Sequence, residues 1–333
     1  MKISAPLPMA AIGVGSLGYH HARLLSAIDE AVVVGIHDAD HARGRQVAEE
    51  LGLRHFENLD ALLRQVEAAV IAVPTTDHSE VALRALDLGV HLLIEKPLAA
   101  SLEEADAILE EATRRGLQVA TGHVERFNGA LRACEPYLEV PRFIESHRLS
   151  PFGLRGTDVA VVLDLMIHDI DLVLGLAQRP VESVDAVGIP VLTPNVDIAN
   201  ARMKFADGAV ANITASRVSR EKMRKIRLFQ ESGYISLDLA AARGEFLRLR
   251  PGAVLASPQA MELGISGLVE RIELEGDGKE PLRAELESFV DAIRGEGRVV
   301  VSGEDGRRAL EVALDIVEGI QSNVPHPRPA RAP

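Results

Sequence analysis

A glycine-rich turn directly after an apolar strand is the feature that most restricts how this chain can fold. The motif GVGSLG follows an apolar run that begins near Met9. In a strand–turn–helix unit, Gly13 permits the tight turn, Gly15 lets the backbone approach a diphosphate, and Gly18 lets the helix lie close to the strand. The diphosphate then binds free amides at the helix N-terminus. The residues predicted to contact it are Gly13, Gly15, Ser16, Leu17 and Gly18.

Up to about Gly122, short apolar runs alternate with longer amphipathic stretches. This pattern is typical of parallel strands joined by crossover helices. The expected strands cover residues 9–14, 32–37, 68–73, 91–94 and 118–121, with a weaker one near His55. A capping box at Ser101 and Glu104 and a stop at Gly116 delimit the helix after the fourth strand. We therefore expect a Rossmann domain, a doubly wound parallel sheet, over residues 1–122.

The pattern changes beyond about Arg126. An expected helix over residues 158–176 is followed by strands that alternate apolar and polar residues. One has Ala201, Met203 and Phe205 on one face, and it is joined by a turn at Asp207 and Gly208 to another that starts at Val210. Further strands are expected at 184–191, 225–230, 234–239, 245–250 and 269–274, and closing helices at 281–294 and 303–322. We expect an α+β domain over residues 123–323, with an open, mainly antiparallel sheet. The proline-rich residues 324–333 predict a flexible tail.

Composition excludes several classes of protein. A chain of 333 residues exceeds the usual size of a single core, so two domains are expected. A net charge of −13 and 3% aromatic residues oppose nucleic-acid binding. No apolar run approaches the roughly 18 residues of a membrane helix. Cys134 is the only cysteine, which excludes an intrachain disulfide and a cysteine-based metal cage. We expect a cytoplasmic protein that binds neither nucleic acid nor membrane.

Asp38 bears on the choice of cofactor. It ends the second strand about 20 residues after the glycine motif, where a carboxylate accepts hydrogen bonds from the adenosine ribose. Because a carboxylate repels a 2′-phosphate, NAD is favoured over NADP, although His41 and Arg43 lie nearby and are able to tolerate a phosphate. The alternative role for Asp38 is to cap the helix that begins near Asp40.

Two further segments follow strands at their carboxyl ends, where doubly wound sheets bind ligands. The residues that we expect near the cofactor are Val73, Pro74, Thr75, Thr76, His78, Glu95, Lys96 and Pro97. Thr75 and Thr76 have helix capping as an alternative, and both roles are compatible. Lys96, stiffened by proline and placed beside the carboxylate of Glu95, is expected to face the ligand crevice rather than bulk water.

Three ionisable residues recur on the expected helix over residues 158–176. Asp164, His168 and Asp171 lie at i, i+4 and i+7, so we expect them on one partly buried face. Such groups are costly to bury unless they are paired or used. One alternative is an Asp/His ladder, worth about a few tenths of a kcal/mol per pair. A divalent metal site is the other, and it is set aside because hydride transfer beside a lysine needs no metal.

These motifs resemble those of the glucose–fructose oxidoreductase, inositol dehydrogenase and rhizopine catabolism (Gfo/Idh/MocA) family, over essentially the whole chain. The resemblance rests on GVGSLG, PTTDH at 74–78, HLLIEKPLA at 91–99, and Asp164 with His168. It implies that Lys96, Asp164 and His168 are catalytic. It also implies that residues 123–323 serve substrate binding and oligomerisation, with the C-terminal sheet forming a homo-dimer or homo-tetramer. Met166 stands where the family has a glycine, which puts the local backbone or substrate fit in question.

Within the family, residues 122–128, 148–155 and 164–174 look most like bacterial enzymes that oxidise the C3 hydroxyl of UDP-N-acetylglucosamine to a ketone. The resemblance implies a UDP-sugar substrate, for which an acidic protein must supply cations locally. The candidate substrate-binding residues are Lys96, Glu125, Arg126, Asn128, Arg148, Arg155, Asp164 and His168. The alternatives are a dehydrogenase of a UDP-sugar uronic acid, inositol or a free sugar, and an NAD-binding sensor without turnover.

Overall fold

The chain forms two compact units. The computed structural model describes residues 5–153, 156, 159–250 and 267–322. Residues 1–127 and 279–310 form the first unit, and residues 128–278 and 311–333 form the second. The predicted tail at 324–333 lies outside the described residues. The segment 279–310, which we expected in the second domain, belongs to the first unit.

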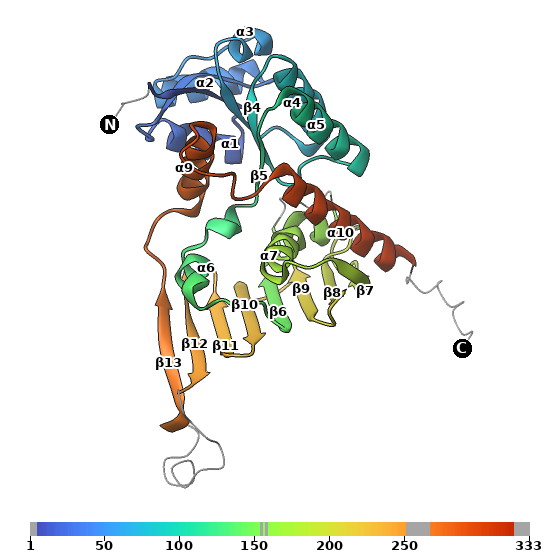
Figure 1. Cartoon of the computed structure of the whole chain (residues 1–333). Coiled ribbons are helices and arrows are strands. Elements are labelled where there is room, and N and C mark those ends of the chain that lie inside the picture. Colours follow the sequence, from blue (N-terminus) through green and yellow to red (C-terminus); the bar gives the residue numbers. More distant parts are fainter. Residues whose placement is uncertain (1–4, 154–155, 157–158, 251–266, 323–333) are drawn as a thin grey trace, which may run out of the picture. The chain divides into compact units, whose positions relative to one another are not determined.

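The first unit contains a five-stranded sheet in the order β2-β1-β3-β4-β5 (Figure 1), and all its pairings are parallel. The strands are β1 (Leu7–Ile12), β2 (Ala31–His37), β3 (Ala68–Ile71), β4 (His91–Glu95) and β5 (Val119–Gly122). The expected Rossmann sheet is thus confirmed, while the weak strand near His55 is reduced to one bridge with Ile36. The strand order changes direction between β1 and β3, so the loops after these strands flank the ligand crevice of such sheets.

Helices follow the strands of this unit as the alternating pattern predicts. They are α1 (Ser16–Leu25), α2 (His41–Leu51), α3 (Leu59–Leu63), α4 (His78–Asp87) and α5 (Leu102–Arg115). Helix α9 (Pro281–Ile293), which comes much later in the chain, also belongs to this unit. Helix α5 has the predicted ends: the Ser101 hydroxyl accepts a hydrogen bond from the Glu104 amide, and Gly116 adopts a left-handed φ of +69°. Both strand faces are therefore covered, which explains why β1, β3 and β4 are almost entirely buried.

Helix α9 explains why residues 279–310 belong to the first unit. Its Leu286, Phe289 and Val290 share one apolar cluster with Met9 of β1 and Leu24 of α1. Position along the chain suggested the second domain, but an amphipathic sequence does not state which surface its apolar stripe covers. Burial against α1 decides the assignment.

The second unit is built on an eight-stranded sheet in the order β13-β12-β11-β10-β6-β9-β8-β7. The strands are β6 (Phe143–Leu149), β7 (Val181–Ile189), β8 (Ile198–Phe205), β9 (Val210–Ser216), β10 (Met223–Gln230), β11 (Gly233–Asp238), β12 (Arg243–Leu249) and β13 (Val269–Glu275). Every pairing is antiparallel except that of β6 with β9, which confirms the mainly antiparallel sheet. Strand β6 was not predicted. Its inward positions are Ile144, Ser146 and Arg148, and the two polar residues hide the alternation.

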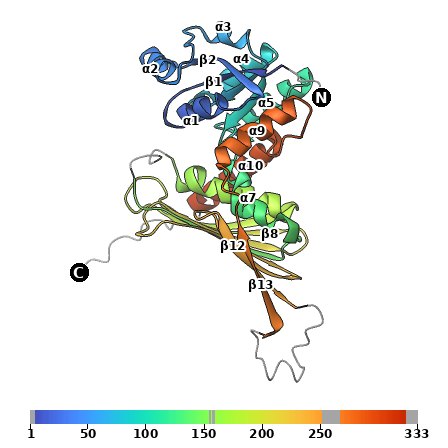
Figure 2. The ribbon, with the colours of Figure 1, turned by 90° about the vertical axis from the view of Figure 1, so that its left-hand side faces the viewer.

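The helices of the second unit lie on one side of this sheet (Figure 2). They are α6 (Gly129–Cys134), the π-helical turn η4 (Val162–Met166), α7 (Ile167–Ala177) and the last part of α10 (Gly303–Ser322), whose first residues belong to the first unit. The opposite face, which we call the open face, carries the outward residues of the strands, such as Val187 of β7 and Phe229 of β10.

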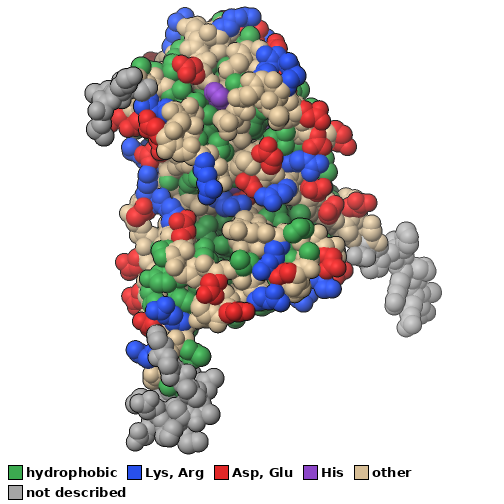
Figure 3. Space-filling view, in the orientation of Figure 1, with side chains coloured by type: hydrophobic (Ala, Val, Ile, Leu, Met, Phe, Trp, Pro, Cys, Tyr) green, Lys and Arg blue, Asp and Glu red, His purple; other side chains and the backbone are tan. Residues whose placement is uncertain are grey.

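Two further properties of the described residues concern their surface charge and the character of their helices. On the face of the molecule shown in Figure 3, Lys and Arg side chains lie interspersed with Asp and Glu side chains. In the part of the chain that the structure describes, no helix combines the length and the apolar character that crossing a membrane requires.

Candidate cofactor and active site

The glycine turn between β1 and α1 divides its three glycines by role. Gly13 has a φ of +78°, and a Cβ there would lie 2.7 Å from the Val73 nitrogen. A Cβ at Gly18 would lie 1.8 Å from the Gly13 oxygen. A Cβ at Gly15 meets none of the described atoms within 4 Å. Gly13 and Gly18 therefore shape the turn, whereas Gly15 borders open space.

The N-terminus of α1 is suited to an anion. Gly15 is the N-cap, no side chain in the described part of the chain caps the helix, and its first turn contains no acidic residue. The amides of the first turn, at Ser16, Leu17 and Gly18, thus point out of the helix at its positive end. Together with the open space beside Gly15, this arrangement fits the diphosphate of a dinucleotide.

Asp38 fastens the glycine turn to the end of β2. Its Oδ2 accepts a hydrogen bond from the Val14 amide at 2.7 Å, and its Oδ1 accepts one from the Asp40 amide at 2.9 Å. The cap of α2 is Asp40, whose side chain accepts from the Ala42 and Arg43 amides. The alternative that Asp38 caps α2 is therefore wrong. Its negative charge lies beside the turn, where it opposes a 2′-phosphate.

His78, predicted as a cofactor contact, has a structural role instead. The side chain is 1% exposed, with Nδ1 3.0 Å from the Pro97 carbonyl oxygen and Nε2 3.1 Å from the Val73 carbonyl oxygen. Burial lowers the pKa of His78, although the carbonyls partly offset this effect. The ring joins the loop after β3 to the loop after β4, which holds both loops at the carboxyl edge of the sheet.

Thr75 and Thr76 lie in the short 3-10 turn between Pro74 and α4. The residue at the N-cap of α4 is Asp77, which makes no side-chain cap, and the Thr76 hydroxyl donates to the Asp77 carboxylate at 3.2 Å. The capping alternative for the two threonines is therefore not realised. Both remain at the carboxyl end of β3, where a cofactor contact stays a prediction.

Glu95, Lys96 and Pro97 follow β4, and the bond between Lys96 and Pro97 is cis. The Glu95 side chain is buried, with Oε1 2.7 Å from Nε2 of His21 in α1, and its Oε2 accepts a hydrogen bond from the Lys96 amide at 3.2 Å. Burial raises the pKa of Glu95, but the His21 hydrogen bond and the neighbouring positive charge outweigh it and bring the pKa below its usual value. Lys96 is half-buried beside this carboxylate.

His21 is a residue that the sequence reasoning missed. It is fully buried and it follows Gly18 by three residues, so it lies on the helix face that Gly18 presses against the sheet. A polar residue one turn after the last glycine of the motif is the signal that indicates it.

In the second unit, Asp164 lies within the π-helical turn η4 and His168 in the first turn of α7. The expected continuous helix is therefore interrupted, and π-helical turns are frequent at functional sites. Asp164 and His168 are half-buried, whereas Asp171 is 1% exposed, so the three do not share one environment. A Cβ at Gly156 would lie 2.6 Å from Oδ2 of Asp164, which places this carboxylate against the glycine backbone.

Met166 occupies the position at which the Gfo/Idh/MocA pattern has a glycine. Its φ of −65° and ψ of −29° are ordinary helical values, and its side chain is fully buried. Because any residue adopts this conformation, the local backbone does not require glycine.

Arg148, predicted to bind the substrate, is committed to a buried ion pair. Its side chain is 3% exposed, and its Nε donates to Oδ2 of Asp169 at 2.5 Å. The Ser146 hydroxyl donates to Oδ1 of the same carboxylate at 2.7 Å. The pair joins β6 to α7 directly after His168. Asp169 was not predicted, because a charged residue gives no sequence sign of burial.

The remaining predicted substrate residues differ in their surroundings. Asn128 caps α6 by accepting from the Ala130 amide at 3.0 Å, and its Nδ2 donates to the Leu239 carbonyl at 2.9 Å, which gives it a structural role. Glu125 is buried and Arg126 half-buried in the 3-10 turn Val124–Phe127. Arg155 lies outside the described residues.

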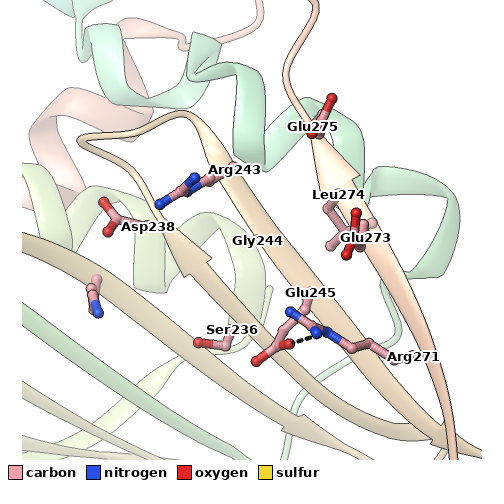
Figure 4. Close-up of a pocket in the computed structure, with 10 residues that line it drawn as sticks. Ser236, Asp238, Arg243, Gly244, Glu245, Arg271, Glu273, Leu274 and Glu275 are labelled. Atoms are coloured by element: carbon pink, nitrogen blue, oxygen red, sulfur yellow. Dashed lines mark ion pairs between the residues drawn. The ribbon is translucent and has the colours of Figure 1, made fainter.

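Two further features concern ligand binding: a pocket in the second unit and the arrangement of side chains that could bind a metal. A pocket of about 430 Å³ lies over β10–β13, and its described lining contains charges of both signs, including Arg271, whose Nε pairs with Oε2 of Glu245 at 2.7 Å (Figure 4). Among the described residues that line it, none is a predicted site residue. Among the described residues, no group of three or more His, Cys, Asp or Glu side chains is arranged to hold a metal ion.

Comparison with known proteins adds a context for these residues. Residues 7–123 match the model of the oxidoreductase family with an NAD-binding Rossmann fold, and residues 135–236 match that of the Gfo/Idh/MocA C-terminal domain. The chain is 38% identical over 312 residues to UDP-N-acetylglucosamine 3-dehydrogenase of Acidithiobacillus ferrooxidans, covering 93% of this chain and 96% of that protein. A solved structure of that enzyme superposes with a TM-score of 0.87 at 36% identity, covering 96% and 99% of the two chains. Myo-inositol 2-dehydrogenase of Thermotoga maritima is 26% identical over 90% of this chain and 92% of its own length.

Proposed function

The chain belongs to the Gfo/Idh/MocA oxidoreductase family, and from this premise we propose that it oxidises the C3 hydroxyl of UDP-N-acetylglucosamine to a ketone with NAD. The observation that carries the proposal is Lys96, held at the carboxyl end of β4 beside the buried carboxylate of Glu95, in the unit that carries the glycine turn. The choice of sugar rests on the relative that is similar along nearly the whole of both chains.

The residues of the first unit fit NAD. When bound, NAD supplies a nicotinamide ring that accepts a hydride. The diphosphate would lie on the α1 amides beside Gly15, and Asp38 would favour an unphosphorylated ribose. The other residues that we propose to line the cofactor are Gly13, Ser16, Leu17, Gly18, Val73, Pro74, Thr75, Thr76, Glu95, Lys96 and Pro97.

Three side chains have proposed roles in the reaction. His168 takes the proton of the C3 hydroxyl as a general base, since imidazole is suited to accept a proton near neutral pH. Lys96 donates a hydrogen bond to the same oxygen and stabilises the negative charge that develops there. Asp164 orients the imidazole or the lysine. Glu125 and Arg126 are proposed to bind the nucleotide sugar.

The experiment is turnover of the purified protein with NAD and a panel of UDP-N-acetylglucosamine, a UDP-sugar uronic acid, myo-inositol and glucose. NADH absorbance and mass spectrometry of the keto product are the readouts. We expect turnover with UDP-N-acetylglucosamine alone. If another compound of the panel is turned over instead, that compound replaces UDP-N-acetylglucosamine as the proposed substrate. If the protein binds NAD but turns over none of the compounds, the result supports a sensor.

A matched pair of variants tests the base. His168→Asn should lower kcat by about 10²- to 10⁴-fold, the usual contribution of a general base, without weakening NAD binding. His147→Asn on β6 is the control and should leave kcat unchanged. Equal effects of the two substitutions would refute the role of His168.

The proposal extends to assembly and location. We propose that the open face pairs with a second copy in a homo-dimer or homo-tetramer, because it carries apolar side chains. Val187 and Ile189 are 57% and 56% exposed, and the Phe229 ring lies tilted between those of Phe143 and Tyr234, with centroids 5.3 and 4.9 Å away. Sedimentation of the wild type and of Phe229→Lys tests the assembly. We expect the wild type to be an oligomer that the substitution dissociates, and a monomeric wild type contradicts the proposed assembly. A cytoplasmic location, where NAD is available, belongs to the same proposal.

A further inference from the structure

We propose that His21 is a positioning residue for Lys96 and acts through the buried carboxylate of Glu95. The inference rests on the proposed function, in which Lys96 bonds the reacting oxygen. It concerns a histidine of α1 that lies within the cofactor-binding unit and has no part in the reaction as described above.

Three elements enclose the Glu95 carboxylate. Nε2 of His21 in α1 lies 2.7 Å from Oε1, and both side chains are buried, at 0% and 10% exposure. The other carboxylate oxygen accepts the Lys96 amide at 3.2 Å. On β5, a Cβ at Gly122 would lie 3.1 Å from Cδ and 3.2 Å from Oε2 of Glu95, so the absence of a side chain there leaves the space that the carboxylate fills.

The chemistry of the pair indicates which way the hydrogen bond runs. The ionised form of Glu95 is favoured, and a carboxylate only accepts hydrogen bonds. Nε2 of His21 therefore carries the proton that it donates. Nδ1 of the same ring is buried and has no hydrogen-bond partner among the described residues. Among the described residues, the ring thus makes one polar contact. Burying an imidazole with only one of its nitrogens hydrogen-bonded costs free energy.

The position of His21 in α1 indicates what its hydrogen bond to Glu95 does. The same helix begins at the turn that fits the diphosphate, and His21 lies one turn beyond Gly18. One rigid element therefore holds both the amides for the cofactor and the donor that fixes the residue next to Lys96. Losing the donor should free Glu95 to move and should leave Lys96 without a fixed neighbour.

Three variants separate this role from packing. His21→Leu removes the donor at similar volume, His21→Gln supplies an amide donor near the Nε2 position, and His20→Leu changes the exposed histidine beside it. For His21→Leu we expect kcat to fall about 10- to 100-fold, the usual effect of losing a hydrogen bond to a charged group, with the substrate KM and the NAD Kd within about twofold. His21→Gln should recover most of the loss, and His20→Leu should match the wild type.

A double-mutant cycle with Glu95→Gln tests whether His21 acts through Glu95. If it does, His21→Leu costs little further kcat once the carboxylate is an amide. The proposal is overturned if the losses of kcat in His21→Leu and Glu95→Gln multiply in the double variant. It is also overturned if the NAD Kd of His21→Leu rises as much as its kcat falls. Either result would assign His21 to the packing of α1.

A readout independent of turnover separates this inference from the proposed function. The acetylation rate of Lys96 by acetic anhydride is measured by peptide mass spectrometry, relative to the other lysines of the chain. We expect faster acetylation in His21→Leu, and wild-type rates in His21→Gln and His20→Leu. If no sugar is turned over but this pattern holds, the proposed function fails and the inference stands; an unchanged rate in His21→Leu overturns the inference whatever the substrate.

Discussion

Asp197 lies between β7 and β8, and its contacts set the size of a measurable effect on stability. Its Oδ2 accepts the amides of Val191, Leu192 and Thr193 at 2.8, 2.6 and 2.8 Å, and its Oδ1 accepts the Thr193 hydroxyl at 2.7 Å. The residue is fully buried. Burial raises the pKa of Asp197, but these hydrogen bonds outweigh it and lower the pKa from 3.8 to about 2.

The lowered pKa is a statement about stability. Each pKa unit corresponds to about 1.36 kcal/mol, so the ionised form stabilises the folded unit by roughly 2.4 kcal/mol relative to the protonated form. The folded protein binds fewer protons than the unfolded chain between the two pKa values. The contribution is therefore complete above a pH of about 4, and it is lost as the pH falls through about 2.

The perturbation is Asp197→Asn, which keeps the shape but removes the charge. With the amide oxygen toward the three backbone amides, the new NH2 donor faces the Thr193 hydroxyl and Arg217, whose Nε lies 3.5 Å from Oδ1 in the wild type. Near neutral pH we expect a loss of about 2 kcal/mol or more in the free energy of unfolding, measured by urea unfolding followed by circular dichroism. The difference from wild type should shrink between a pH of about 4 and a pH of about 2. Asp185→Asn on the exposed face of β7 is the control and should change little.

Two results would refute this reasoning. A loss that is the same near pH 7 and near pH 3 would mean that the ionised carboxylate is not the source of the stability. A loss below about 0.5 kcal/mol near pH 7 would mean that the three amides gain nothing from the charge.

Three further sets of substitutions test the glycine turn, the Arg148–Asp169 ion pair and Asp38. Gly15→Val should abolish NAD binding, measured by calorimetry, with little change in Tm. Gly18→Val should instead cost about 1–3 kcal/mol of stability, because its side chain meets the Gly13 carbonyl. A similar Tm for both variants contradicts the different roles of the two glycines. Arg148→Met should cost about 3–5 kcal/mol in urea unfolding by leaving Asp169 buried without its cation, and adding Asp169→Leu should recover most of it; additive losses argue against the pair. Asp38→Ala should raise the affinity for NADP relative to NAD by about tenfold or more, and an unchanged ratio removes Asp38 from cofactor selection.

The sequence predicts structure best where a single physical principle, such as burial or helix capping, determines the element. The glycine turn, the apolar parallel strands and the ends of α5 were all predicted, because burial and capping leave a direct trace in residue type. The antiparallel strands with regular alternation, such as β8 (Ile198–Phe205), were predicted for the same reason. The assignment of α9 failed because periodicity reveals an apolar stripe and not its partner.

Polar residues in buried positions account for the misses in the second unit. In strand β6, the side chains that point toward the helices include Ser146 and Arg148. Both are buried, but polar residues in a sequence pattern predict solvent exposure. Asp169 completes that group from α7, far along the chain. The same applies to Asn128, which looks like a ligand in the sequence and serves as a helix cap and strand contact. A charged or amide side chain shows its partner only when the fold brings the two together.

The two candidate reactive residues share one local arrangement. Lys96 directly follows Glu95, and His168 directly precedes Asp169; in each case the acid is buried and the candidate residue is half-buried. Each acid is held by a donor from another element, His21 of α1 for Glu95 and Arg148 of β6 for Asp169.

Fixing the neighbouring acid fixes the backbone beside the reactive side chain while leaving that side chain accessible, which is what a preorganised site requires. It follows that weakening either buried bond should reduce kcat more than substrate affinity, although neither donor need touch the substrate. If Arg148→Met lowered stability alone, with kcat preserved at a temperature where the variant remains folded, the arrangement beside His168 would be scaffold only. The parallel with Lys96 would then fail.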